Sequence, residues 1–101
     1  MGAGVYALTQ QIPKGRVSTY AAIANALGQP KAARAVGAIL RVNPTPIVVP
    51  CHRVVYSDGR LGGYGGAGGE PRKAQLLKSE GVVVENGRIQ QFERCLFTGF
   101  S

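Results

Sequence analysis

The chain has 101 residues, a length typical of one folded domain, so we expect a single domain over residues 1–101. Twelve Lys and Arg residues against five Asp and Glu give a formal net charge of +7, which favours a polyanionic partner through long-range steering and counterion release. No apolar run approaches the ~20 residues of a membrane span, and the N-terminus lacks a signal-peptide pattern, so we expect a cytoplasmic protein, or a nuclear one in a eukaryote, with no membrane partner.

The first half of the chain has the pattern of short helices. Apolar residues recur at helical spacing over residues 5–12, and a proline ends that segment. Ser18 or Thr19 can cap a second helix over residues 20–27, which is followed by a glycine suited to a helix end. A third, alanine-rich helix is expected from about residue 31 to residue 41. Two short helices joined by a tight turn with a glycine predict a helix-turn-helix.

The second half alternates short strands with one more helix. The expected elements are a buried strand over 47–49, a strand over 54–56, a glycine-rich loop over 61–69, a helix over 70–81 and a hairpin over 82–90. Asn86-Gly87 is a strong signal for the turn of that hairpin, and the tail from residue 91 either packs back or frays. We therefore predict a mainly α fold with a small β wing or hairpin, a winged helix-turn-helix-like DNA-binding domain.

Cys51 is followed directly by His52, the only histidine of the chain. A thiol is a poor nucleophile until it loses its proton, which an imidazole can accept directly or through one water. The imidazole needs an orienting carboxylate, for which Glu80 is the first candidate and Glu70 the second. The competing interpretation is an inert buried cysteine, because most free cysteines behave as small hydrophobes. Cys95 is expected to be structural or inert, and we expect no metal site with one histidine and no Cys-x-x-Cys pair.

The run from Asn43 to Val55, NPTPIVVPCHRVV, closely resembles the active-site segment of the O6-alkylguanine-DNA alkyltransferases. Other segments are similar to further parts of that family, in the same order: the helix-turn-helix entry at 12–20, the recognition helix at 30–37, the substrate loop at 61–64 and the final helix at 76–81. The resemblance covers about residues 3 to 90 and concerns the family's C-terminal domain. The resemblance does not include the N-terminal domain that is common in the family.

The resemblance implies a protein that flips O6-alkylguanine out of duplex DNA and transfers the alkyl group irreversibly to Cys51. In this scheme His52 deprotonates the thiol through a bridging water, Glu80 orients the imidazole, and Asn43 braces the turn that presents the cysteine. The implied contacts to DNA and to the flipped base come from Tyr20, Ala21, Gln29, Arg34, Val54, Ser57, Tyr64 and Gly65.

The implied partner is double-stranded DNA approached from the minor groove by a monomer. Extrusion is required because a thiolate cannot reach an atom inside a stacked duplex. Small residues on the third helix would permit close approach to a groove only about 6 Å wide, with Arg34 filling the space left by the base. No cofactor is implied, and each molecule would act once, because a thioether is not reversed by thiol exchange.

Two other functions remain open from the sequence. Single-domain alkyltransferase-like proteins bind alkylated DNA without repairing it and typically lack the cysteine, whereas this chain has their length and retains Cys51. A helix-turn-helix transcription regulator with a structural cysteine would instead bind a specific sequence in the major groove, with no preference for alkylated DNA.

Overall fold

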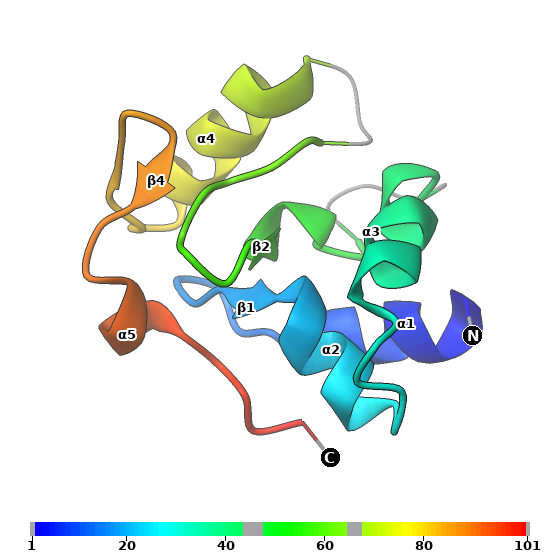
Figure 1. The fold of residues 1–101 in the computed structure, drawn as a ribbon. Coiled ribbons are helices and arrows are strands. Elements are labelled where there is room, and N and C mark those ends of the chain that lie inside the picture. Colours follow the sequence, from blue (N-terminus) through cyan, green and yellow to red (C-terminus); the bar gives the residue numbers. More distant parts are fainter. Residues whose placement is uncertain (1, 44–47, 65–67, 101) are drawn as a thin grey trace.

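The computed structural model describes residues 2–43, 48–64 and 68–100. The helices are α1 (Gly2–Thr9), α2 (Tyr20–Ala26), α3 (Ala33–Arg41), α4 (Gly69–Ser79), α5 (Phe92–Cys95) and the single 3-10 turn η1 (Cys51–Arg53). The strands are short: β1 (Ser18–Thr19), β2 (Val54–Val55), β3 (Val84–Glu85) and β4 (Arg88–Ile89) (Figure 1). The predicted mainly α fold with a small β hairpin is confirmed. Within the described ranges, no helix is long and apolar enough to cross a membrane.

The helix-turn-helix consists of α2 and α3, which pack against each other. Thr19 caps α2, because its hydroxyl oxygen accepts a hydrogen bond from the Ala22 amide at 2.9 Å. Gly28 follows with a φ of +76°, the left-handed conformation that the predicted helix end requires. α3 begins at Ala33, two residues later than predicted, because the amide of Ala32 bonds to the carbonyl of Gln29 in a separate turn.

The first helix is shorter than its apolar pattern predicted. α1 ends at Thr9, whose hydroxyl donates to the carbonyl of Val5 at 2.7 Å. Ile12 is still buried, but it reaches the core from the turn that follows the helix. The apolar spacing therefore predicted correctly that Ile12 is buried, but it predicted a helix that ends too late.

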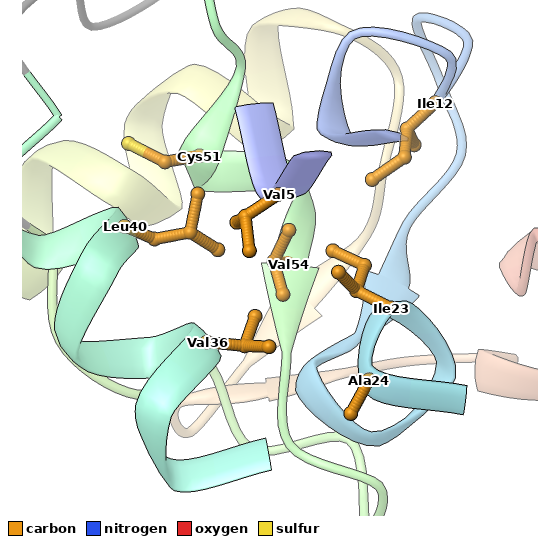
Figure 2. Close-up of a cluster of buried hydrophobic side chains, with 8 residues drawn as sticks. All are labelled: Val5, Ile12, Ile23, Ala24, Val36, Leu40, Cys51 and Val54. Atoms are coloured by element: carbon orange, nitrogen blue, oxygen red, sulfur yellow. The ribbon is translucent and has the colours of Figure 1, made fainter. Parts of the chain in front are cut away.

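A two-stranded parallel sheet divides the hydrophobic core. β1 pairs with β2, with Ser18 opposite Val54 and Thr19 opposite Val55. Successive strand residues point to opposite faces, and accordingly Val54 packs among the first three helices while Val55 packs with Leu77 of α4. Figure 2 shows the cluster on the Val54 side, which includes Cys51.

The predicted buried strand over 47–49 is confirmed only at Val49, which is buried and forms an isolated β-bridge. Residues 44–47 lie outside the described ranges, and Val48 is in a turn with 68% of its surface exposed. The carbonyl of Val49 accepts hydrogen bonds from the side-chain amide of Asn43 at 2.8 Å and from the backbone amide of Cys51 at 2.7 Å. These bonds turn the backbone toward η1 directly after Val49.

The C-terminal part agrees well with the sequence. α4 lies within two residues of its predicted bounds, and the β3–β4 hairpin turns at Asn86 and Gly87, which both have positive φ. The tail packs back: Leu96 forms a parallel bridge with Val17, and two phenylalanines beyond it pack against the core cluster of Figure 2.

Candidate active site

Cys51 opens the 3-10 turn η1 directly after Pro50. Its side chain is 5% exposed and borders the core cluster of the first three helices, and Figure 2 shows its sulfur at the edge of that cluster, directed away from Val5. The buried hydrogen bond from Asn43 to the carbonyl of Val49 holds the segment that leads into this turn. Asn43 therefore lies where it can brace the presentation of the cysteine, the place that the sequence implied for it.

His52 is fully buried beside the carboxylate of Glu80. The imidazole Nε2 lies 3.1 Å from Oε2 of Glu80, although this approach is off the direction of an aligned hydrogen bond. Among the described residues, Nδ1 of the imidazole has no hydrogen-bond partner. Burial lowers the pKa of His52, against the opposing effect of Glu80. The imidazole is therefore neutral near pH 7 and has a free ring nitrogen to accept a proton.

Arg53 holds Glu80 in place, a contact that the sequence did not reveal. Its Nε and Nη2 donate to the two carboxylate oxygens at 2.9 and 2.6 Å, and its Nη1 donates to the carbonyl of Ile12 at 2.8 Å. Burial raises the pKa of Glu80, but the hydrogen bonds from Arg53 and the close approach of His52 outweigh it, and the net pKa is lowered. Glu80 is therefore ionised. The second candidate carboxylate, Glu70, is an exposed residue in the first turn of α4.

Lys73 is a fully buried cation that the sequence analysis did not identify. Its Nζ donates to the carbonyls of Val54, Leu61 and Gly63 at 2.7, 2.5 and 3.1 Å, and it lies 3.4 Å from the hydroxyl of Tyr20. Burial lowers the pKa of Lys73 from 10.5 to about 8, while negative charge on Cys51 opposes that change. Helical spacing gave a usable signal, because Lys73 lies one turn before the buried Leu77.

A pocket of about 430 Å³ lies in front of Cys51. Its lining includes Tyr20 at the start of α2, Arg34 and Arg41 on α3, and Tyr56 after β2. Burial raises the pKa of Tyr20 to about 12, with smaller contributions from Tyr56 and Cys51, so its hydroxyl keeps its proton. The pocket thus combines a cysteine at one wall, a neutral phenol and two guanidinium groups.

Of the other predicted contact residues, two line this pocket. Ala21 and Ser57 line it, whereas Gln29 is exposed in the turn between α2 and α3. Tyr64 is half-buried against the core cluster. Burial raises the pKa of Tyr64, and negative charge on the nearby Cys51 raises it further. The carbonyl of Val54 is bonded to the ammonium of Lys73. Gly65 lies outside the described residues.

This arrangement suits proton transfer from a thiol and nucleophilic attack by sulfur. The neutral His52 can accept a proton, and the ionised Glu80 stabilises the imidazolium that results. Within the part of the chain that the structure describes, no three His, Cys, Asp or Glu side chains gather as a metal site requires.

The chain matches a known family over most of its length. Residues 2–82 match the family model described as 6-O-methylguanine DNA methyltransferase, DNA binding domain. The methylated-DNA–protein-cysteine methyltransferase of Salmonella typhimurium is 50% identical over 80 residues, which are 79% of this chain and 46% of that protein. The chain spans 30% to 46% of the length of the curated relatives it matches.

Solved structures with similar folds include complexes with DNA. Mycobacterium tuberculosis OGT in complex with DNA is 46% identical, with a TM-score of 0.74 over 78% of this chain and 48% of that chain. S. pombe Atl1, in complex with damaged DNA containing O6-carboxymethylguanine, is 33% identical, with a TM-score of 0.82 over 95% of this chain and 93% of that chain.

Proposed function

The chain belongs to the family of 6-O-methylguanine DNA methyltransferase DNA-binding domains, and on this premise we propose that it removes alkyl groups from O6-alkylguanine in duplex DNA. The observation that carries the proposal is that Cys51 lines a pocket while the adjacent His52 is buried against Glu80. The acceptor is the sulfur of Cys51, and each molecule reacts once.

The first step is loss of the thiol proton. The lowered pKa of His52 keeps its imidazole neutral near pH 7, so it accepts the proton from Cys51 directly or through one water. Glu80, held ionised by the fork of Arg53, balances the positive charge that the imidazole acquires. The ammonium of Lys73 and the negative charge on the sulfur favour each other.

The second step is the transfer itself. The thiolate electron pair forms the new S–C bond to the alkyl carbon while the C–O6 bond breaks and its electrons remain on the guanine. The guanine then takes up one proton from the hydroxyl of Tyr20, which lies on the pocket wall and keeps its proton to high pH. The proton that His52 took from the thiol returns through solvent to the Tyr20 oxygen, so both side chains end as they began. The products are an uncharged thioether on Cys51 and an unmodified guanine.

Delivery of the base requires extrusion from the duplex. Arg34 is exposed on the face of α3 that borders the pocket, and its long cationic side chain suits filling the space that the base leaves. Small residues beside it, Ala33, Gly37 and Ala38, also border the pocket and permit close approach of the helix to a minor groove. The net charge of +7 provides attraction to the phosphate backbone.

The decisive experiment measures intact protein mass after incubation with a duplex that carries one O6-methylguanine. We expect a gain equal to replacement of one hydrogen by a methyl group, absent in Cys51→Ala and retained in the matched control Cys95→Ala. An unchanged mass with every variant, at protein concentrations that saturate the DNA, would contradict the transfer.

A second candidate is recognition of the lesion without transfer. It is favoured by the similarity to S. pombe Atl1, which extends over 93% of that chain. The same experiment distinguishes the two functions, because a sensor binds the O6-methylguanine duplex more tightly than the unmodified duplex while its mass stays constant. A protein with no preference for the lesion would be neither an alkyltransferase nor a lesion sensor. Sequence-specific regulation of transcription would then be the remaining function.

A further inference from the structure

Tyr56 lines the pocket but has no part in the proposed chemistry. Its ring centroid lies 5.3 Å from that of Tyr20, and the two ring planes are inclined at 55°. Aromatic pairs with this separation and tilt attract each other beyond the effect of buried area. Tyr56 is 43% exposed, so the needs of a hydrophobic core do not explain where its ring lies.

Two neighbours hold the Tyr56 ring against Tyr20. The guanidinium carbon of Arg60 lies 5.1 Å from the Tyr56 centroid, and Asp58 fixes that guanidinium through an ion pair of 2.7 Å. Gly62 approaches both rings: a Cβ built there would lie 2.9 Å from a ring carbon of Tyr56 and 3.4 Å from the hydroxyl oxygen of Tyr20. With a φ of +74° as well, this position favours glycine on two independent grounds.

Tyr20 is held from two other directions by elements of the core. A Cβ built on Gly37 of α3 would lie 3.7 Å from the Tyr20 ring, in ordinary contact distance. On the α4 side, Nζ of Lys73 lies 5.7 Å from the Tyr20 centroid and 3.4 Å from its hydroxyl. The third support, Tyr56, belongs to the exposed turn after β2. One of the three supports of Tyr20 is therefore a surface side chain.

We propose that Tyr56 is a positioning residue whose ring holds Tyr20 in the orientation in which it contacts the extruded nucleotide. Of the proposed function, this role requires extrusion of the nucleotide and does not require alkyl transfer. Loss of the Tyr56 ring removes the lateral support of Tyr20 and leaves the groups that activate Cys51 in place, since His52 lies against Glu80, Arg53 holds Glu80, and backbone carbonyls hold Lys73.

The test separates extrusion from binding and from chemistry. A 2-aminopurine placed beside O6-methylguanine fluoresces when its neighbour unstacks, and the Cys51→Ala background keeps the lesion from being consumed. In that background we expect Tyr56→Ala and Tyr56→Leu to lower the extrusion equilibrium roughly tenfold, equivalent to about 1.4 kcal/mol and within the range for an aromatic pair. Tyr56→Phe should retain the signal, because it keeps the ring.

The controls identify what a loss of signal means. Tyr6→Ala removes a half-buried tyrosine that packs on the core and bonds to Ile39, so it tests the general effect of losing an aromatic ring; it should leave extrusion unchanged. Affinity for unmodified duplex, from fluorescence anisotropy, should be equal in all variants. Equal extrusion with and without the Tyr56 ring, or a parallel loss of affinity for unmodified duplex, would overturn the positioning role. Absence of extrusion with Tyr56 intact would instead overturn the proposed function.

Discussion

Replacing Lys73 with methionine should remove a rise in stability that the unsubstituted protein shows in mildly alkaline solution. Burial lowers the pKa of Lys73 from 10.5 to about 8. Each pKa unit corresponds to about 1.4 kcal/mol, so the change in the pKa of Lys73 between the unfolded and the folded state amounts to about 3 kcal/mol in the free energy of unfolding. This is a large share of the roughly 5–15 kcal/mol that stabilises an ordinary domain.

The sign follows from proton binding. Between about pH 8 and pH 10.5 the unfolded chain still holds the Lys73 proton while the folded protein has released it, so the free energy of unfolding rises with pH. Tyr20 acts in the opposite direction above pH 10, because burial raises its pKa from 10.0 to about 12 and the folded state then binds more protons. The rise is therefore expected between about pH 8 and pH 10.

Urea denaturation followed by circular dichroism, at closely spaced pH values, measures this dependence. Lys73→Met should lack the rise, and Lys73→Gln should lack it too while remaining more stable at pH 7 than Lys73→Met. The reason is that an amide can still donate to the carbonyls of Val54 and Leu61, which methionine leaves without that partner. Parallel curves for the unsubstituted protein and both variants would refute the assignment of this titration to Lys73.

Three further predictions concern the same site. Arg53→Met should destabilise the protein by about 3 kcal/mol, because it leaves the largely buried Glu80 without its guanidinium partner. It should also move the acid limb of the pH–rate profile for alkyl transfer to higher pH, and an unshifted profile would contradict the role of Arg53. The buried, neutral His52 should make stability fall as pH drops below 6.5, where the unfolded chain takes up its proton first, and His52→Gln should flatten that part of a urea-denaturation series. Gly62→Ala should cost about 1–3 kcal/mol through its positive φ and its contact with the ring of Tyr56, whereas Gly63→Ala, where a Cβ meets nothing within 4 Å, should leave the melting temperature unchanged.

Local signals in the sequence were sufficient for most of the secondary structure. Thr19 caps α2 and Gly28 follows it because a hydroxyl and a glycine satisfy the unpaired groups at helix ends through local geometry. Asn86 and Gly87 form the hairpin turn for an equally local reason, their tolerance of positive φ. Such elements depend on a few consecutive residues, and a single sequence contains that information.

Elements that depend on distant partners were beyond the sequence. The parallel pairing of β1 with β2 joins two-residue strands that are far apart in the chain, and no periodicity can develop over two residues. Val48 belongs to an apolar run and is nevertheless exposed, because the backbone turns where Asn43 and Cys51 bond to Val49. Tertiary contacts determined these outcomes, and local propensity did not.

The same distinction applies to the site. The order of Cys51 and His52 is visible in the sequence, and Glu80 already ranked above Glu70, but only the structure shows Glu80 beside His52 and Glu70 exposed. A lysine on an amphipathic helix is ordinarily assigned to solvent. Lys73 is buried because three carbonyls of the surrounding backbone replace its water. Carbonyl directions in a loop cannot be derived from residue types.

The position of the reactive segment explains why both halves of the fold are needed for it. Cys51 borders the core cluster of the first three helices, whereas Glu80 and Lys73 come from α4 and its end, on the other side of β2. The stretch from Cys51 to Val55 contributes to both clusters of the core, and the ammonium of Lys73 bonds within that stretch, to the carbonyl of Val54. A cysteine at this junction acquires its histidine–carboxylate pair and its neighbouring cation only when the helix-turn-helix and α4 are packed together. Reactivity of Cys51 is thereby coupled to folding of the whole domain, because loss of α4 would remove Lys73 and the support of Glu80.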